Sequence, residues 1–181
     1  MRSSLATLVL VISIAEAVAQ SPDHLPGKPI AKPLPDWCQH GECVTPTIEY
    51  MEPMMFHESG VLFRVVGQSW SFSMASPKKK TRDPGSQQSF VFCSKQLPAV
   101  IDPYEGKFMV TFLTLDDDSR YGHANEISLS HYFAVCHGRL FDSMVTGGAE
   151  FAKSLGYKVR DRDDQPTINR PQEIVRFIPK S

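Results

Sequence analysis

The sequence lacks an excess of charge of either sign. Its 181 residues include 19 basic and 20 acidic side chains, giving a formal net charge of −1. A dedicated nucleic-acid-binding protein carries a large basic excess, so we expect no nucleic acid as a partner. Hydrophobic residues make up 41% of the chain, which excludes a disordered chain, a collagen-like repeat and a coiled coil. The composition is that of a globular protein with one sizeable core.

Hydrophobic runs of membrane-spanning length are also lacking. The run Leu5–Ala15 follows a single positive charge at Arg2, and it is shorter than the ~20 residues that a transmembrane helix needs. Ala17-Val18-Ala19 then matches the pattern that signal peptidase accepts. We therefore predict a signal peptide over 1–19, cleaved near Ala19, and a periplasmic or secreted protein that is not transmembrane. An uncleaved anchor or a buried N-terminal helix is the alternative.

Asparagine is scarce, and neither Asn125 nor Asn169 lies in a glycosylation sequon. The sequence therefore favours a bacterial envelope protein over a glycosylated eukaryotic product. Residues 20–36 contain five prolines, which disfavour a helix and predict an extended, flexible leader. This leader is a spacer or, alternatively, a proline-rich ligand for a partner domain. Residues 37–181 are predicted to form a single β-rich domain.

Apolar alternation and β-forming residues predict most of the secondary structure in this domain. We expect an α+β, mainly β fold: an antiparallel sheet, sandwich or small barrel of five to seven strands with one short C-terminal helix. The helix should cover Gly148–Leu155 and end at Gly156, because glycine commonly terminates helices. The expected strands are Thr47–Met51, Val61–Val66, Trp70–Met74, Phe90–Cys93, Lys107–Leu115 in the centre of the sheet, Leu129–Cys136, and a closing strand at Glu173–Ile178.

Four cysteines form an even set, which predicts disulfides in an exported protein. Three pairings are open to four cysteines. The spacing favours a local bridge between Cys38 and Cys43 and a longer one between Cys93 and Cys136.

A metal site is the alternative for the same residues. Cys38, His40 and Cys43, completed by Cys136-His137, could bind zinc or copper. However, no C-x-x-C half-site is present, and export favours oxidised thiols. The acidic run Asp116–Asp118 does not fit the spacing of a calcium loop in either register, so we interpret it as a soluble hairpin loop. We predict no metal and no cofactor.

Nucleophilic catalysis would need a serine or cysteine, a base and an orienting group close together. The sequence has no G-x-S-x-G motif and brings no such group together locally, so catalytic residues cannot be assigned. The alternating strand serines are interpreted as a solvent-facing row, and His131 as a satisfied strand histidine. The candidates for a histidine hydrolase are His40, His57, His123, His131 and His137 as bases, with Cys93, Ser69, Ser71 or Ser73 as the nucleophile.

A basic run at Lys78, Lys79, Lys80 and Arg82 could contact an anionic partner, such as a phospholipid surface or an acidic protein. A solvated hairpin tip is the simpler interpretation, because Pro77 and Pro84 flank the run.

Taken together, these patterns favour an exported, disulfide-stabilised binding module without catalytic activity. Its ligand would be an unidentified envelope or extracellular protein or a small molecule, and its oligomeric state is open. The alternative is a small exported hydrolase that uses histidine with serine or cysteine, and a weaker alternative is a metal-handling protein.

Overall fold

A computed structural model describes residues 33–115, 126–140, 144–157 and 164–179. The predicted signal peptide, most of the proline-rich leader and the acidic run at 116–118 lie outside these residues.

The described residues form one open antiparallel sheet of eight strands. Its order is β1-β2-β3-β5-β6-β7-β8, and β4 pairs with β3 off this path. The mainly β, antiparallel character agrees with the sequence prediction. The sheet has eight strands instead of the expected five to seven, and the sandwich and the closed barrel are not formed. The strands are β1 (Trp37–Gln39), β2 (Glu42–His57), β3 (Gly60–Ser73), β4 (Thr81–Arg82), β5 (Gln87–Cys93), β6 (Ala99–Tyr104), β7 (Lys107–Phe112) and β8 (Thr167–Ile168).

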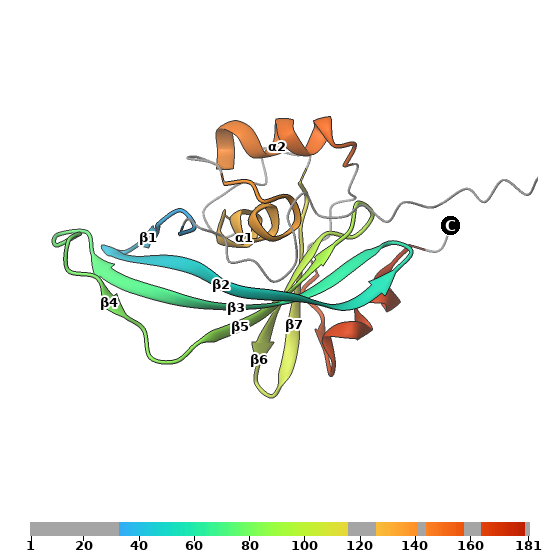
Figure 1. The fold of residues 1–181 in the computed structure, drawn as a ribbon, viewed down its shortest axis with the longest axis horizontal. Coiled ribbons are helices and arrows are strands. Elements are labelled where there is room, and N and C mark those ends of the chain that lie inside the picture. The colour runs from blue at the N-terminus through green and yellow to red at the C-terminus, as the bar shows by residue number, and fades with distance from the viewer. Residues whose placement is uncertain (1–32, 116–125, 141–143, 158–163, 180–181) are drawn as a thin grey trace, which may run out of the picture.

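The long hairpin of β2 and β3 forms one side of the sheet (Figure 1). Its register shifts twice, between Ile48 and Tyr50 and between Pro53 and Met55, as happens at β-bulges. Gly67 pairs with Ile48 beside the first shift, and a Cβ there would lie 2.3 Å from the carbonyl oxygen of Thr47. Only glycine therefore permits this close approach of the two strands.

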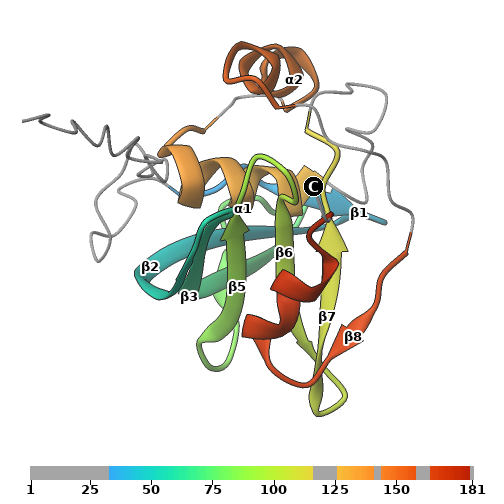
Figure 2. The ribbon, with the colours of Figure 1, turned by 90° about the vertical axis from the view of Figure 1, so that its right-hand side faces the viewer.

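Helical segments cover both faces of the sheet, which makes it the middle layer of the molecule (Figures 1 and 2). Helices α1 (Glu126–His137) and α2 (Met144–Ser154) lie on one face, and the 3₁₀ helix η2 (Pro171–Phe177) lies against the other. Side chains alternate between two cores along β3. Phe63 joins the core beneath α1, whereas the neighbouring Leu62 joins the core that contains Ile174 of η2.

The predicted strand Leu129–Cys136 is wrong, because this segment lies in α1. All residues from Leu129 to Cys136 except His131 are buried, so the helix contacts apolar neighbours nearly all round. A helix of this kind shows no polar face and hence no period of 3.6 residues. Its β-forming side chains then resemble a buried strand.

Two further strand predictions are corrected. Glu173–Ile178 was expected as a closing strand, but Pro171 begins the 3₁₀ helix η2 over this segment. Lys107–Leu115 was expected in the centre of the sheet, but β7 ends at Phe112 and lies next to the two-residue strand β8. The apolar residues of β7 are covered by η2 instead of by further strands.

The predicted C-terminal helix is confirmed as α2, which covers Met144–Ser154, although the described residues contain three helical segments instead of one. Gly156 ends this helix with a φ of 79°. The Gly156 amide donates to the carbonyl of Lys153 and the Tyr157 amide donates to the carbonyl of Ala152. These two bonds form a Schellman motif, whose left-handed residue is most easily supplied by glycine.

Two disulfides join the cysteines that the spacing paired. Cys38 and Cys43 close the hairpin of β1 and β2, where they face each other in register. Cys93 at the end of β5 bonds to Cys136 in the last turn of α1, a separation of 43 residues. The second bridge therefore fixes α1 to the sheet.

We expect the Cys93–Cys136 bridge to contribute more stability than the Cys38–Cys43 bridge. Loop entropy predicts about 4 kcal/mol for a 43-residue loop and about 2 kcal/mol for a five-residue loop. Urea unfolding of the Cys93→Ala/Cys136→Ala and Cys38→Ala/Cys43→Ala variants measures the difference. An equal or larger loss in the second variant would contradict this ranking.

Candidate functional site

A cavity of about 300 Å³ lies between α1 and the sheet. Strands β1, β2, β3, β5 and β6, the first half of α1, and Leu34 just before β1 all contribute to its wall. Most of the wall is apolar, including Leu34, Val44, Ile48, Val65, Val100 and Ile127. Its polar lining includes Ser89, Asp102, Ser128 and His131.

The sheet places its polar residues in this wall through strand alternation. Ser89 of β5 pairs with Val65 of β3, so the two side chains share the face beneath α1. Asp102 of β6 shares that face with Val100, two residues earlier on the same strand. The carboxyl group therefore lies among apolar side chains.

Helical spacing brings two further polar lining residues together on α1, while Thr47, Gln87 and Gln88 line the cavity from the sheet. Ile127, Ser128 and His131 lie at positions i, i+1 and i+4 of the helix, which places them on one flank. All three line the cavity, whereas Phe133 on the same helix packs against Phe151 of α2. The flank of α1 that faces the sheet near its N-terminal half thus forms the cavity roof.

The two titratable groups of the cavity are shifted in opposite senses. Burial lowers the pKa of His131 from 6.5 to about 4, so its imidazole is neutral at pH 7. Burial raises the pKa of Asp102 above its ordinary value. Neither side chain makes a hydrogen bond to another described residue, and no lysine or arginine is found among the described residues that line the cavity.

The cysteine chemistry that the sequence left open is excluded by the disulfides. All four cysteines are oxidised, so Cys93 has no thiolate to act as a nucleophile, and Cys38 and Cys43 have none to bind zinc or copper. Within the described ranges, no group of three or more histidine, cysteine, aspartate or glutamate side chains is arranged to hold a metal ion.

The strand serines bond to groups other than histidine among the described residues. Their interpretation as a solvent-facing row is wrong for Ser69, which is buried. The hydroxyls of Ser69 and Ser71 both donate to the carboxylate of Asp83, while the Ser73 hydroxyl lies 3.5 Å from the carbonyl of Gly41. These bonds hold the segment after β4 against β3 and form no nucleophile–base pair.

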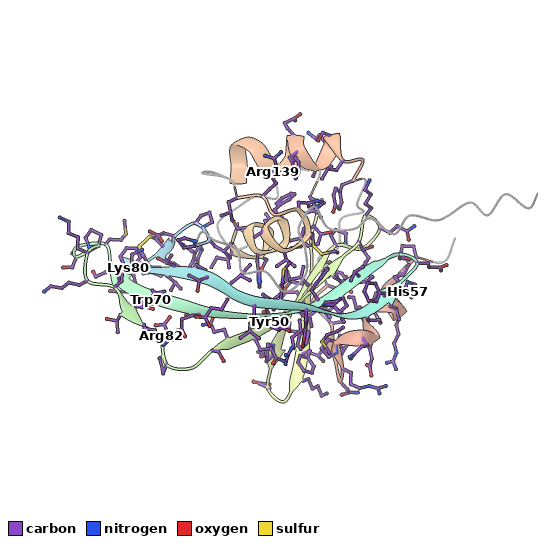
Figure 3. The ribbon with its side chains drawn as sticks, in the orientation of Figure 1. Tyr50, His57, Trp70, Lys80, Arg82 and Arg139 are labelled. Carbon is purple, nitrogen blue, oxygen red and sulfur yellow. A yellow bond between two sulfur atoms is a disulfide. The ribbon has the colours of Figure 1, made fainter. Side chains whose placement is uncertain are left out.

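The other candidate histidines are dispersed. His40 is exposed in the β1–β2 turn, and His57 accepts a bond from the amide of Ser59 at the closed end of the long hairpin (Figure 3). The Nε2 atom of His137 lies 2.8 Å from the hydroxyl of Tyr157. His123 lies outside the described residues. Among these candidates, His131 is the one that lines the cavity.

The basic run lies at the open end of the hairpin (Figure 3). Lys80 is engaged there: its ammonium donates to the hydroxyl of Thr45 at 2.8 Å and lies 4.5 Å from the centre of the Phe72 ring. Arg82 lies 3.9 Å from Glu49. Lys78 and Lys79 are exposed. Contact of Lys78, Lys79, Lys80 and Arg82 with an anionic partner stays a prediction.

Sequence reasoning missed Asp102 and undervalued His131. An aspartate between Ile101 and Pro103 gives no signal of its own, because its environment depends on α1, which is distant in sequence. His131 was considered on a strand, where it has no relation to Ile127 or Ser128. Recognition of the helix would have placed these three residues on one flank.

Comparison of the chain with family models, with curated proteins and with solved structures finds no match. None of the helices in the described residues combines the length and the apolar character needed to cross a membrane.

The shifted pKa of His131 predicts a loss of stability in mild acid. Between pH 6.5 and about 4 the unfolded chain binds a proton at this residue and the folded chain does not. The contribution of His131 to the free energy of unfolding is therefore largest above pH 6.5 and falls by up to about 3 kcal/mol as the pH drops to 4. Urea titrations across this range should show a shallower loss in the His131→Gln variant.

The exposed His40 supplies the control. His40 has a φ of 51°, a conformation that asparagine tolerates, so the His40→Asn variant should fold. Because this variant leaves His131 in place, its stability should keep the wild-type dependence on pH. The same slope in His131→Gln as in the wild type would show that His131 does not cause the loss.

Proposed function

We propose that the chain is an exported binding module without catalytic activity, and that its ligand site is the cavity between α1 and the sheet. The observation that carries the proposal is a preformed, mostly apolar cavity whose polar lining includes two titratable groups, Asp102 and His131. Ligand sites in proteins commonly combine an apolar wall with a few placed polar groups. A volume of about 300 Å³ lies at the lower end of the range for such sites, so the ligand is small.

The disulfides support the exported location, because such bonds persist in oxidising compartments. They also support a binding role, since the Cys93–Cys136 bridge fixes the C-terminal end of α1, the helix that roofs the cavity, to the end of β5. A site of this kind needs little rearrangement when a ligand enters, which favours binding.

A serine hydrolase is the second candidate, because Ser89 and Ser128 line the same cavity as His131. A nucleophile and its base are expected within hydrogen-bond reach of each other. No hydrogen bond joins His131 to either serine in the part of the chain that the structure describes. Its pKa of about 4 also makes His131 a weak base at pH 7, so binding is favoured over catalysis.

Binding is tested with 2-phenylethanol, a neutral probe that combines an apolar ring with one hydroxyl. We expect saturable binding, with a dissociation constant of about 1 mM, measured by NMR titration. Ser89→Phe fills the cavity from the floor and should weaken binding at least tenfold. Val66→Phe makes a similar enlargement on the opposite face of β3 and should leave binding unchanged.

Ser128→Phe, which fills the cavity from α1, serves if Ser89→Phe does not fold. Binding that is unaffected by a folded cavity-filling variant would contradict the proposed site. Turnover of p-nitrophenyl acetate that is lost in Ser128→Ala or Ser89→Ala would establish the hydrolase instead.

A further inference from the structure

We propose that the cavity selects ligands that carry a protonated amine on a small apolar body, with the carboxylate of Asp102 as the counter-charge. This inference rests on the proposed function and specifies the chemical class of its ligand.

The charge of the described cavity wall supports this choice. Asp102 is its one acidic residue, and no described lysine or arginine shares the wall. The nearest basic cluster in sequence, Lys78–Lys80, lies at the open end of the hairpin, where Lys80 contacts Thr45 and Phe72. A negative group without a positive neighbour leaves the cavity complementary to a cation.

The position of Asp102 makes this complementarity strong. Its strand enters the sheet through the buried residues Ala99, Val100 and Ile101, and Asp102 is the first residue of β6 that is not buried. The carboxylate is thus partly removed from bulk water without a protein partner that replaces the lost hydration. An ammonium group that donates a hydrogen bond to it restores this interaction and gains a charge-assisted bond in a low-dielectric site.

His131 is compatible with a cationic ligand because it adds no positive charge to the cavity. Its imidazole is neutral at pH 7, as burial lowers its pKa to about 4. A neutral imidazole offers one donor and one acceptor nitrogen. It can therefore accept a second hydrogen bond from the amine or bond to a neighbouring hydroxyl, whereas a protonated imidazole would repel the cation.

One feature of the cavity favours the opposite charge. Ile127 and Ser128 lie in the first turn of α1, and the amide groups at a helix N-terminus attract anions. The effect of a helix terminus is commonly below that of a hydrogen bond to a charged group in a desolvated site. Probes of similar size and opposite charge distinguish the attraction of Asp102 for cations from the attraction of the α1 N-terminus for anions.

The probes are 2-phenylethylamine, 2-phenylethanol and phenylacetate, which share one ring and differ in charge. In NMR or calorimetric titrations at pH 7.5, we expect the amine to bind about tenfold more tightly than the alcohol, and phenylacetate to bind most weakly. Asp102→Asn should bring the amine within about threefold of the alcohol while the alcohol affinity stays unchanged.

Glu105→Gln is the matched control, because it removes the same charge three residues away at an exposed position outside the described cavity wall. It should keep the wild-type preference for the amine. Asp102→Ser replaces Asp102→Asn if the latter does not fold.

Equal binding of amine and alcohol to the wild type would overturn this inference and leave the proposed binding function standing. The same holds if Asp102→Asn keeps the amine preference, or if phenylacetate binds most tightly, which would assign the selection to the N-terminus of α1. Failure of all three probes to bind would reject the proposed function itself.

Discussion

The attachment of α1 to the end of β5 is the constraint on which the rest of the structure depends. The Cys93–Cys136 disulfide supplies its covalent part. Beside it, the hydroxyl of Tyr132 accepts a bond from the amide of Ser94 at 3.2 Å and lies 3.0 Å from the hydroxyl of Tyr157. The chain of bonds continues to His137. A buried polar network whose members are all partnered specifies one arrangement of the elements that it joins. Sheet, α1 and the segment after α2 are thereby fixed together.

This attachment explains why a cavity forms at the other end of the helix. The C-terminal half of α1 is held close to the sheet by Tyr132 and Cys136, and Phe133 fills the space toward α2. The N-terminal half presents Ser128 and His131 to the cavity instead, which Val65 and Val100 of the sheet also line.

The sequence predicted the sheet because its signals are local. Alternation in Trp70–Met74 and the short Cys38–Cys43 spacing both report on neighbouring residues. The structure has the first disulfide and a strand at these positions, but the predicted strands Val61–Val66 and Trp70–Met74 are one continuous strand, β3, which ends at Ser73. Helix α1 was misassigned because burial on nearly all sides removes the polar face that identifies a helix. The candidate site could not be predicted from the sequence for a related reason. Asp102 and His131 line one cavity because of tertiary packing, and neither lies in a recognisable sequence motif.

Whether the cavity is suited to binding or to catalysis depends on how burial changes the properties of Asp102 and His131. A catalytic pair works best when its pKa values lie near the operating pH, and burial moves the pKa of His131 away from neutrality, to about 4. The same desolvation makes the carboxyl of Asp102 more responsive to a charged partner, because less water competes for it. An environment that weakens His131 as a base thus strengthens Asp102 as a recognition element. In the binding function that we propose, the carboxylate of Asp102 would hold a small cation, and the Cys93–Cys136 bridge would limit the rearrangement of α1 on binding.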